Sequence, residues 1–292
     1  SQKFVFLESM AQKRLSPNTK PQQHLEFHLV KIFSVLQNRY INREKTAHLY
    51  LIRLFLISII IMKKTLSTVL ASLLSFINAN AADIDVSADI SSDTTWSASN
   101  TYMLKDYIFV EPGATLTIEA GTTIKADQGS GDAAPALIVT QGAKINAVGT
   151  ATNPIIFTSI LDSGSLTKDN KGLWGGLIIL GNAPINSNGG SNADNTPLTN
   201  TIEGVPTTSG ISGRSISASY SLYGGTDASD DSGTLQYVSI RHGGAEIGSG
   251  NEINGLTLGG VGNGTTIDHI EVFANKDDGI EFFGGSVNAK FL

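Results

Sequence analysis

The sequence predicts that residues 82–292 form an all-β solenoid, on three observations. Short apolar runs alternate with Gly, Asn, Asp and Pro, and long helical patterns are almost absent. Similar runs recur about every twenty residues, since Leu116 and Leu137 are 21 residues apart and Ile155 and Leu177 are 22 apart. One apolar pattern is also repeated near the end of the chain. A short fixed period with one or two strands per turn is typical of stacked coils.

Each predicted strand is short and is bounded by residues that favour turns. Alternating apolar and polar residues, or a run of β-branched residues, predict a strand, and Gly, Asn, Asp or Pro predicts its end. The runs of this kind in the first half of the solenoid are Ala114–Glu119, Ala136–Val139, Pro154–Phe157 and Gly176–Leu180.

The repeated pattern near the end of the chain predicts which side chains form the core. Its copies are Leu235-x-x-Val238-x-Ile240, Ile253-x-x-Leu256-x-Leu258 and Ile267-x-x-Ile270-x-Val272, and Ile280 begins a further strand. Residues two apart lie on one face of a strand, so the last two apolar residues of each copy are expected to point inward. Glycine pairs permit the sharp corners that follow, at Gly243-Gly244, Gly259-Gly260 and Gly284-Gly285.

Four segments of the solenoid resemble those of secreted bacterial right-handed parallel β-helix proteins, the pectate-lyase-like superfold. They are Gly121–Lys125, Gly172–Gly176, Leu235–Gly244 and Asn275–Gly279, and the resemblance covers residues 95–292. It implies a right-handed parallel β-helix. Proteins of this fold include polysaccharide lyases and hydrolases, adhesins and surface proteins without a known reaction, so the resemblance does not select an activity.

Residues 62–81 have the pattern of a secretory signal peptide. Met62-Lys63-Lys64 is a positive start, Thr65–Ile77 is an apolar stretch, and Ala79-Asn80-Ala81 is a small-x-small cleavage site. We therefore expect an exported protein, found in the periplasm, at the cell surface or outside the cell. Its mature part is expected to begin at Ala82 and to contain no membrane span.

Residues 1–61 are predicted to be an unrelated helical or disordered flank that is not part of the mature protein. Their apolar stretch Leu49–Ile61 contains Arg53. The alternative is a membrane hairpin in which Leu49–Ile61 pairs with Leu66–Ile77. At the other end, Val287–Leu292 reads as the start of another strand without a polar cap, so we expect a β-helix that is truncated at its C-terminus.

Charge and cysteine content exclude several kinds of partner and site. Residues 1–64 contain 11 Lys or Arg and 3 Asp or Glu, whereas residues 82–292 contain 9 and 23. The acidic mature part is a poor partner for nucleic acid. The chain has no cysteine, which excludes disulfides, thiolate metal sites and a cysteine nucleophile. Polysaccharides, cell-surface glycans and metal cations remain as partners.

The segment Asn186–Gly233 interrupts the period and is rich in Asn, Ser, Gly, Thr and Asp. It predicts a long excursion from one coil, with room for a short hairpin of its own. Long loops on a rigid scaffold often carry binding sites, and Tyr220 and Tyr223 are the candidate ligand-binding residues. The alternative is a solvated insertion without a role.

Two groups of acidic residues form a candidate calcium site. They are Asp227, Asp230 and Asp231 before the Leu235 strand, and Asp277, Asp278 and Glu281 around Gly279. Carboxylates from successive coils can meet at one edge and bind Ca²⁺ through oxygen. The spacing does not match an EF-hand, because Ser232 stands where that loop needs glycine. Aspartates that form turns are the alternative explanation.

Arg241 is the candidate catalytic residue. The resemblance implies lyases in which carboxylates bind calcium and an arginine removes a proton, and Arg241 with Asp277 and Asp278 would form such a site. A salt bridge or a solvated corner is the alternative.

Trp174, between glycines, is the remaining candidate for ligand binding, because an exposed indole can stack on a sugar ring. It can equally cover a corner of the coil and shield the core.

The sequence therefore leaves three functions open. The first is an exported module of the cell surface or extracellular space that binds glycans or other surfaces without catalysis. The second is a calcium-dependent polysaccharide lyase or hydrolase. The third is a structural spacer for a further C-terminal domain.

Overall fold

The computed structural model describes residues 28–32, 55–59, 82–186, 198–248 and 251–292. The chain divides into two compact units, residues 1–78 and 79–292. In the first unit, residues 28–32 and 55–59 are helical. No helix among the described residues is long and apolar enough to cross a membrane. The predicted signal peptide, residues 62–81, lies outside the described residues, as does most of the alternative membrane hairpin.

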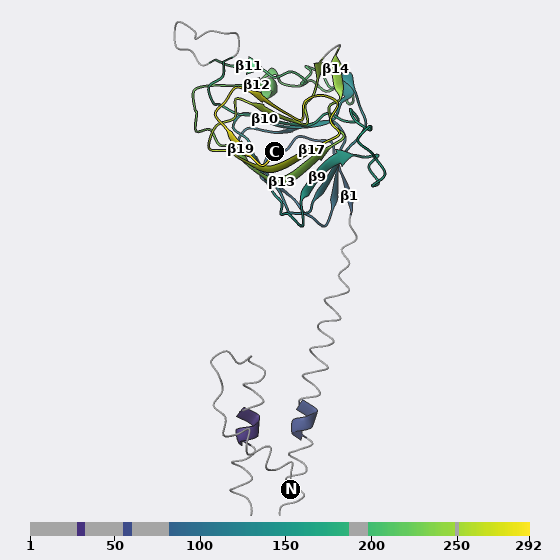
Figure 1. The fold of residues 1–292 in the computed structure, drawn as a ribbon, viewed down its shortest axis with the longest axis vertical. Helices are drawn as coiled ribbons and strands as arrows, with labels where there is room; N and C mark the ends of the chain where they lie inside the picture. The colour runs from purple at the N-terminus through teal and green to yellow at the C-terminus, as the bar shows by residue number, and fades with distance from the viewer. Residues whose placement is uncertain (1–27, 33–54, 60–81, 187–197, 249–250) are drawn as a thin grey trace, which may run out of the picture. The chain divides into compact units, whose positions relative to one another are not determined.

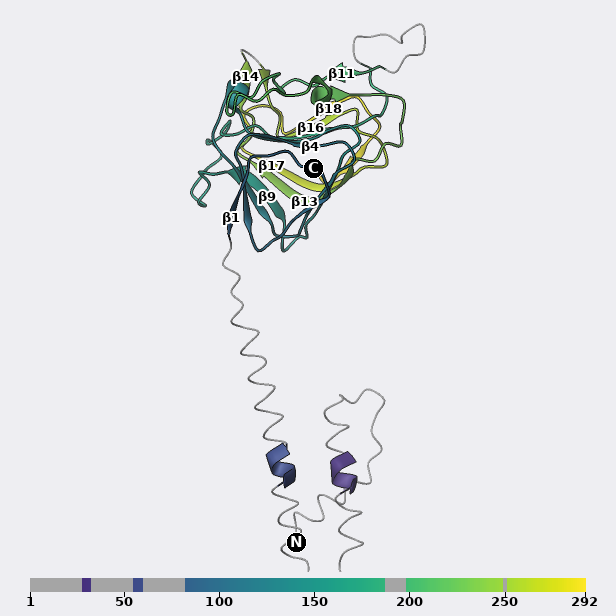
Figure 2. The same ribbon diagram turned by 180° about the vertical axis from the view of Figure 1, so that it is seen from behind.

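The second unit is an all-β, right-handed parallel β-helix, as the sequence predicts (Figures 1 and 2). Sheet A has ten strands and sheet B has five, and every pairing within them is parallel. Sheet A consists of β1 (Asp83–Val86), β2 (Thr94–Trp96), β3 (Thr101–Leu104), β5 (Thr115–Ile118), β6 (Thr123–Ala126), β8 (Lys144–Val148), β9 (Ile155–Ser159), β13 (Gly233–Arg241), β17 (Thr266–Phe273) and β19 (Asn288–Lys290). Sheet B consists of β4 (Tyr107–Val110), β7 (Ala136–Val139), β10 (Leu177–Leu180), β16 (Leu256–Gly259) and β18 (Ile280–Phe283).

Four short strands lie outside the two large sheets. The antiparallel pair β11 (Asn200–Thr201) and β12 (Leu222–Tyr223) lies in the excursion, but residues 202–221 join its strands, so it is a wider hairpin than the short one expected there. A second antiparallel pair joins β14 (Glu246–Gly248) to β15 (Asn251–Glu252). Two 3₁₀ turns, η1 (Gly131–Ala133) and η3 (Ala218–Ser221), lie in the connections.

Sheet A bends sharply, so that it supplies two of the three faces of the coil. The first half of β13 pairs with β8 and its second half with β9, and Tyr237 stands between the halves with φ 50°. In β17, His269 has φ 53° at the same place. A left-handed residue at one position re-aims the backbone without ending the strand.

The core of the β-helix contains the side chains that the repeat predicted. Leu235, Val238 and Ile240 pair in register with Ile267, Ile270 and Val272 of the next coil. Leu256 and Leu258 are also fully buried in the same cluster. Stacking identical faces in this way produces continuous apolar ladders, which is the main source of stability for a solenoid.

The period of about twenty residues is wrong as a description of the stacking, although it indicated the right fold. Leu116 stacks on Ile145 within sheet A, whereas Leu137 belongs to sheet B. Ile155 and Leu177 likewise lie in different sheets. The connections differ in length from coil to coil. Residues about twenty positions apart in sequence can therefore belong to strands of different faces.

The excursion is a second layer over sheet B. We call its described part, residues 198–232, the cover segment. Tyr107, Phe109 and Ile178 point outward from sheet B and are buried in a second apolar cluster. Ile202, Ile216 and Tyr223 of the cover segment complete this cluster, and Figure 1 shows β11, β12 and β14 above sheet B. The cover segment is therefore packed on the β-helix and is not a solvated insertion.

Candidate functional site

A cavity of about 440 Å³ lies where the cover segment meets the C-terminal side of sheet B. The cover segment supplies one wall, β18 and the glycine after it supply another, and the end of the β10 connection closes the third side. The lining residues are Ile185, Asn186, Asn200, Thr201, Glu203, Tyr223, Phe283 and Gly284. We call this cavity the β18 pocket.

Local backbone structure fixes the walls of the β18 pocket. The β11–β12 hairpin places Asn200 opposite Tyr223. The Tyr223 ring meets the edge of the Phe283 ring at a centroid distance of 6.0 Å. Gly284 has φ 69°, and a Cβ there would lie 2.8 Å from the Ile185 side chain, so a glycine is required at this close approach.

Glu203 lines the β18 pocket, and the charges of further acidic side chains act on it. Burial, followed by the charges of Asp277 and Glu252, raises the pKa of Glu203 above its usual value. Burial also raises the pKa of Glu281, as do the charges of Glu203, Asp278 and Asp277, although a hydrogen bond from Asn254 opposes this shift. Asp277 thus disfavours ionisation of both Glu203 and Glu281.

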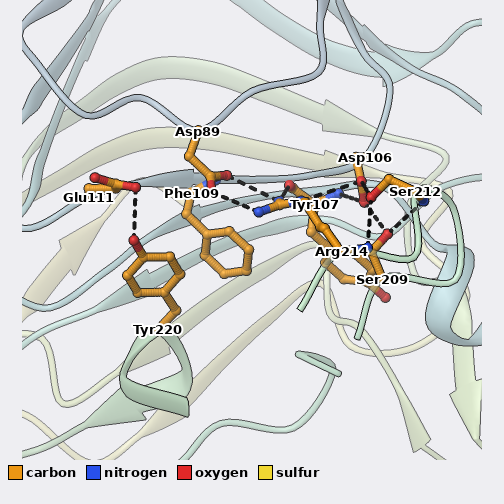
Figure 3. Close-up of polar contacts among 9 residues, drawn as sticks. All are labelled: Asp89, Asp106, Tyr107, Phe109, Glu111, Ser209, Ser212, Arg214 and Tyr220. Carbon is orange, nitrogen blue, oxygen red and sulfur yellow. Dashed lines mark hydrogen bonds and ion pairs between the residues drawn. The ribbon is translucent and has the colours of Figure 1, made fainter. Parts of the chain in front are cut away.

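A partly buried ion-pair network holds the cover segment on sheet B, with the side chains of Arg214 and Asp89 28% and 16% exposed. Figure 3 shows Arg214 of the cover segment between Asp89 and Asp106. Its Nη1 and Nη2 lie 2.7 and 3.1 Å from the two carboxylate oxygens of Asp89, a bidentate pair. Its Nε lies 3.5 Å from Asp106 Oδ2, and Nη2 also donates to the carbonyl of Tyr107. We call these four residues the cover clamp.

Hydroxyl groups of the cover segment complete the contacts of Asp106. Ser209 Oγ and Ser212 Oγ each donate to this carboxylate at 2.5 Å, and the Tyr107 amide donates at 2.7 Å. The side chain of Asp106 is only 3% exposed. A carboxylate this deeply buried must be paired and hydrogen-bonded, which is what these donors provide.

Tyr220 anchors the cover segment at a second point. Its ring packs on Phe109 at a centroid distance of 4.9 Å, and its hydroxyl donates to Glu111 at 2.8 Å (Figure 3). Burial and the neighbouring Glu111 raise the pKa of Tyr220 from 10.0 to about 12. The side chain is therefore used for packing, and the β18 pocket is lined by other residues.

The Tyr220 anchor predicts a specific alkaline sensitivity. A raised pKa means that the folded state favours the protonated phenol, so its contribution is complete below pH 10 and is lost as the pH rises towards about 12. We expect Tyr220→Phe to lose stability less steeply over this range than the wild type. Urea unfolding followed by circular dichroism at pH 9, 10 and 11 measures the slope. Equal slopes for the two proteins would contradict the assignment.

The three aromatic candidates from the sequence fall in different environments. Trp174 is fully buried, and its Nε1 donates to the carbonyl of Arg241 at 2.8 Å, which leaves no ring face for a sugar. Tyr220 is the anchor described above. Tyr223 lines the β18 pocket but is only 4% exposed, so Phe283 offers more of its ring to a ligand than Tyr223 does.

Arg241 does not contact the acidic residues proposed for a lyase site. Its Nε donates to Ser239 Oγ at 2.7 Å, and its Nη2 forms an ion pair with Glu271 at 3.2 Å. These partners lie on the outer side of sheet A. The arrangement corresponds to the salt bridge that was the alternative interpretation of this residue.

The structure separates the two acidic groups of the predicted calcium site. Asp230 packs against Gly262, just after β16, whereas the carbonyl of Asp278 accepts from Gly255, just before β16. The two groups thus lie at opposite ends of one strand.

The individual contacts explain why these residues do not fit a shared cation. Asp227 accepts from the hydroxyl and amide of Ser229, and Asp231 forms an ion pair with Lys144 at 2.6 Å. Within the part of the chain that the structure describes, no three or more His, Asp or Glu side chains are arranged to hold a metal ion. The turn-forming role, which was the alternative, accounts for Asp227.

The sequence pointed to Tyr223 and Glu281 but not to their neighbours Glu203, Asn200 and Phe283. Glu203 lies in a polar excursion without a motif, and Phe283 looked like one more residue of a strand. The position of Phe283 on an outward face was the available signal, since alternation places it opposite the inward Phe282.

Comparison with protein families gives one match. A model described as a pectate-lyase like beta helix domain matches residues 88–292, which is most of the chain. Comparisons with curated proteins and with solved structures give no match.

Proposed function

The chain belongs to the family of pectate-lyase-like beta helix domains, and from this premise we propose that it is an exported module that binds glycans at the β18 pocket without cleaving them. Its export is proposed from the leader pattern of residues 62–81.

One observation carries the binding proposal. The β18 pocket combines an aromatic ring with amides, a hydroxyl and a carboxylate from Phe283, Asn186, Asn200, Thr201 and Glu203. Its volume of about 440 Å³ falls in the ordinary range for small-ligand sites. A sugar presents the complementary surface, with C–H groups for the ring and hydroxyls for the polar side chains.

Retention on immobilised polysaccharides tests this proposal. We expect Phe283→Ala to lower the affinity for the retaining glycan roughly three- to tenfold, as expected for loss of a ring contact. Phe282→Ala is the matched control, because Phe282 is the adjacent residue of β18, is 47% exposed and does not line the pocket.

Asn186→Ala provides a second pocket variant that leaves the Tyr223–Phe283 contact in place. Equal losses of glycan affinity in the Phe282 and Phe283 variants, with no loss of affinity in the Asn186 variant, would contradict a site in the β18 pocket. Absence of retention on every polysaccharide would favour a structural spacer.

A glycoside hydrolase is the second candidate, on one observation. Glu203 lines the pocket and its charge acts on Glu281, and the pKa values of both carboxyl groups are raised, chiefly by burial. Paired carboxylates with one raised pKa are the usual machinery for glycoside hydrolysis. New reducing ends in the retained polysaccharide, absent with Glu203→Gln, would establish this activity.

A further inference from the structure

We propose that the ligand of the β18 pocket carries a positive charge, as an amino sugar with a free ammonium group does, and that the pocket rejects uronates. This inference rests on the proposed function, because it assigns the ligand class of the same pocket.

The residues that line the pocket contain a carboxylate and no cationic side chain. Glu203 is the charged member among the eight. The sequence has no lysine or arginine between Lys171 and Arg214, so the excursion brings none to this side before the cover clamp. A uronate needs a cationic partner for its carboxylate, and arginine is the usual choice.

Two cations close in sequence to the pocket walls, Arg214 and Lys276, are already paired with carboxylates. Arg214 is held by Asp89 and Asp106 in the cover clamp. Lys276 forms an ion pair with Glu246 at 2.6 Å and lies 3.9 Å from Glu252. Neither the Arg214 guanidinium nor the Lys276 ammonium can therefore neutralise an acidic sugar without breaking its existing ion pair.

The carboxylates around the pocket create an excess of negative charge. Glu203 lines the pocket and its charge acts on Glu281, and Asp277 acts on both of them. Their pKa values are raised, which is the response of carboxylates to burial and to like charges without sufficient cations. A ligand ammonium would relieve this repulsion, whereas a ligand carboxylate would add to it.

The remaining pocket residues suit an ammonium group as well as a sugar ring. The Phe283 ring is partly exposed at the wall, and an aromatic face attracts a nearby cation. The side-chain carbonyl oxygens of Asn186 and Asn200 are acceptors, which an ammonium with three donors can use.

Three sugars of equal length test the proposal in calorimetric titrations at pH 6, where free amines are protonated. They are a glucosamine oligomer, its fully N-acetylated form and a galacturonate oligomer. We expect the glucosamine oligomer to bind at least tenfold more tightly than the acetylated form, and the galacturonate oligomer not to bind. The preference should shrink at high salt, because exposed charges are screened.

Glu203→Gln should weaken glucosamine binding several-fold and weaken binding of the acetylated oligomer less, so that the preference for the glucosamine oligomer shrinks. Asp169→Asn is the matched control, since it removes the same charge from an exposed site that pairs with Lys168. Glu281→Gln, which removes a neighbouring charge without changing a lining residue, should weaken glucosamine binding less than Glu203→Gln does. Thermal unfolding of each variant verifies that it is folded.

The outcomes separate the inference from the proposed function. Equal affinity for the glucosamine and acetylated oligomers would overturn the charge preference and leave glycan binding in place. Tighter binding of the galacturonate oligomer would also overturn it. Equal losses of affinity for the glucosamine oligomer in the Glu203 and Asp169 variants would mean that binding depends on the overall charge of the protein. That result would overturn a site in the pocket. Binding of none of the oligomers would overturn both proposals.

Discussion

Replacement of Arg214 by alanine is expected to lower the free energy of unfolding by roughly 3–5 kcal/mol, the usual effect of removing one partner of a buried ion pair. The reason is the environment of its partners. The side chains of Asp89 and Asp106 are 16% and 3% exposed, so loss of the guanidinium would leave two poorly hydrated carboxylates without their cation. The hydroxyls of Ser209 and Ser212 can donate to Asp106, but they carry no charge.

The same substitution should loosen the cover segment before the β-helix unfolds. Sheet B would then expose Tyr107, Phe109 and Ile178, which are now buried under that segment. We expect increased binding of a hydrophobic dye at low urea, followed by cooperative loss of β-structure. Glycan retention should fall too, because the cover segment supplies Asn200, Thr201, Glu203 and Tyr223 to the pocket.

Arg241→Ala is the matched control for this experiment. Arg241 is also an arginine paired with a carboxylate, but the side chains of Arg241 and Glu271 are 34% and 58% exposed. An exposed pair of this kind contributes roughly 0–1 kcal/mol. The free energy of unfolding of Arg214→Lys should lie between those of the two alanine variants, because lysine keeps the charge but cannot form the bidentate pair. If urea unfolding showed similar losses of free energy of unfolding for Arg214→Ala and Arg241→Ala, the proposed role of the cover clamp would be contradicted.

The fold could be predicted because the core of a β-helix follows from strand alternation. Val238, Ile240 and their partners on the next coil are two residues apart, and this local spacing survives whatever the connections do. The spacing of about twenty residues could not predict which strands stack on each other, because Leu116 belongs to sheet A and Leu137 to sheet B.

The sequence of sheet B indicated a second apolar layer, between this sheet and another segment. Leu177–Leu180 is apolar at every position, which is typical of a strand buried on both faces. Sheet B therefore needed a cover, and the polar excursion was the segment available to provide it. Its apolar residues Ile202 and Ile216 are isolated in sequence, so their common surface appears only after folding.

The candidate site depends on contacts between distant segments, which explains why the sequence revealed so little of it. The charge of Glu203 reaches Glu281 only because the cover segment returns to β18, and Arg214 contacts Asp89 across more than a hundred residues. Asp230 and Asp278, which were expected to meet on successive coils, lie instead near opposite ends of β16. Local patterns identify strands and turns, whereas this pocket is a product of topology.

Trp174→Ala is expected to lower the free energy of unfolding by roughly 3–5 kcal/mol, the range for removing a large aromatic side chain from a core. Trp174 is fully buried in the main apolar cluster. Its removal leaves a cavity between coils and also leaves the carbonyl of Arg241 without its indole donor. Trp174→Phe should retain most of the packing and lose about 1–3 kcal/mol, mainly through the unpaired carbonyl.

This variant also distinguishes a core tryptophan from a sugar platform. If Trp174 acts only in the core, Trp174→Phe should unfold at lower urea concentration than the wild type while its affinity for glycans, measured on folded protein, stays unchanged. A platform tryptophan would give the reverse result, with stability preserved and affinity reduced. Because the indole N–H is donated internally and no part of the ring is exposed, the first outcome is expected. The glycines on either side of Trp174 then serve coil packing, since a Cβ at Gly175 would lie 2.8 Å from the carbonyl of Pro135.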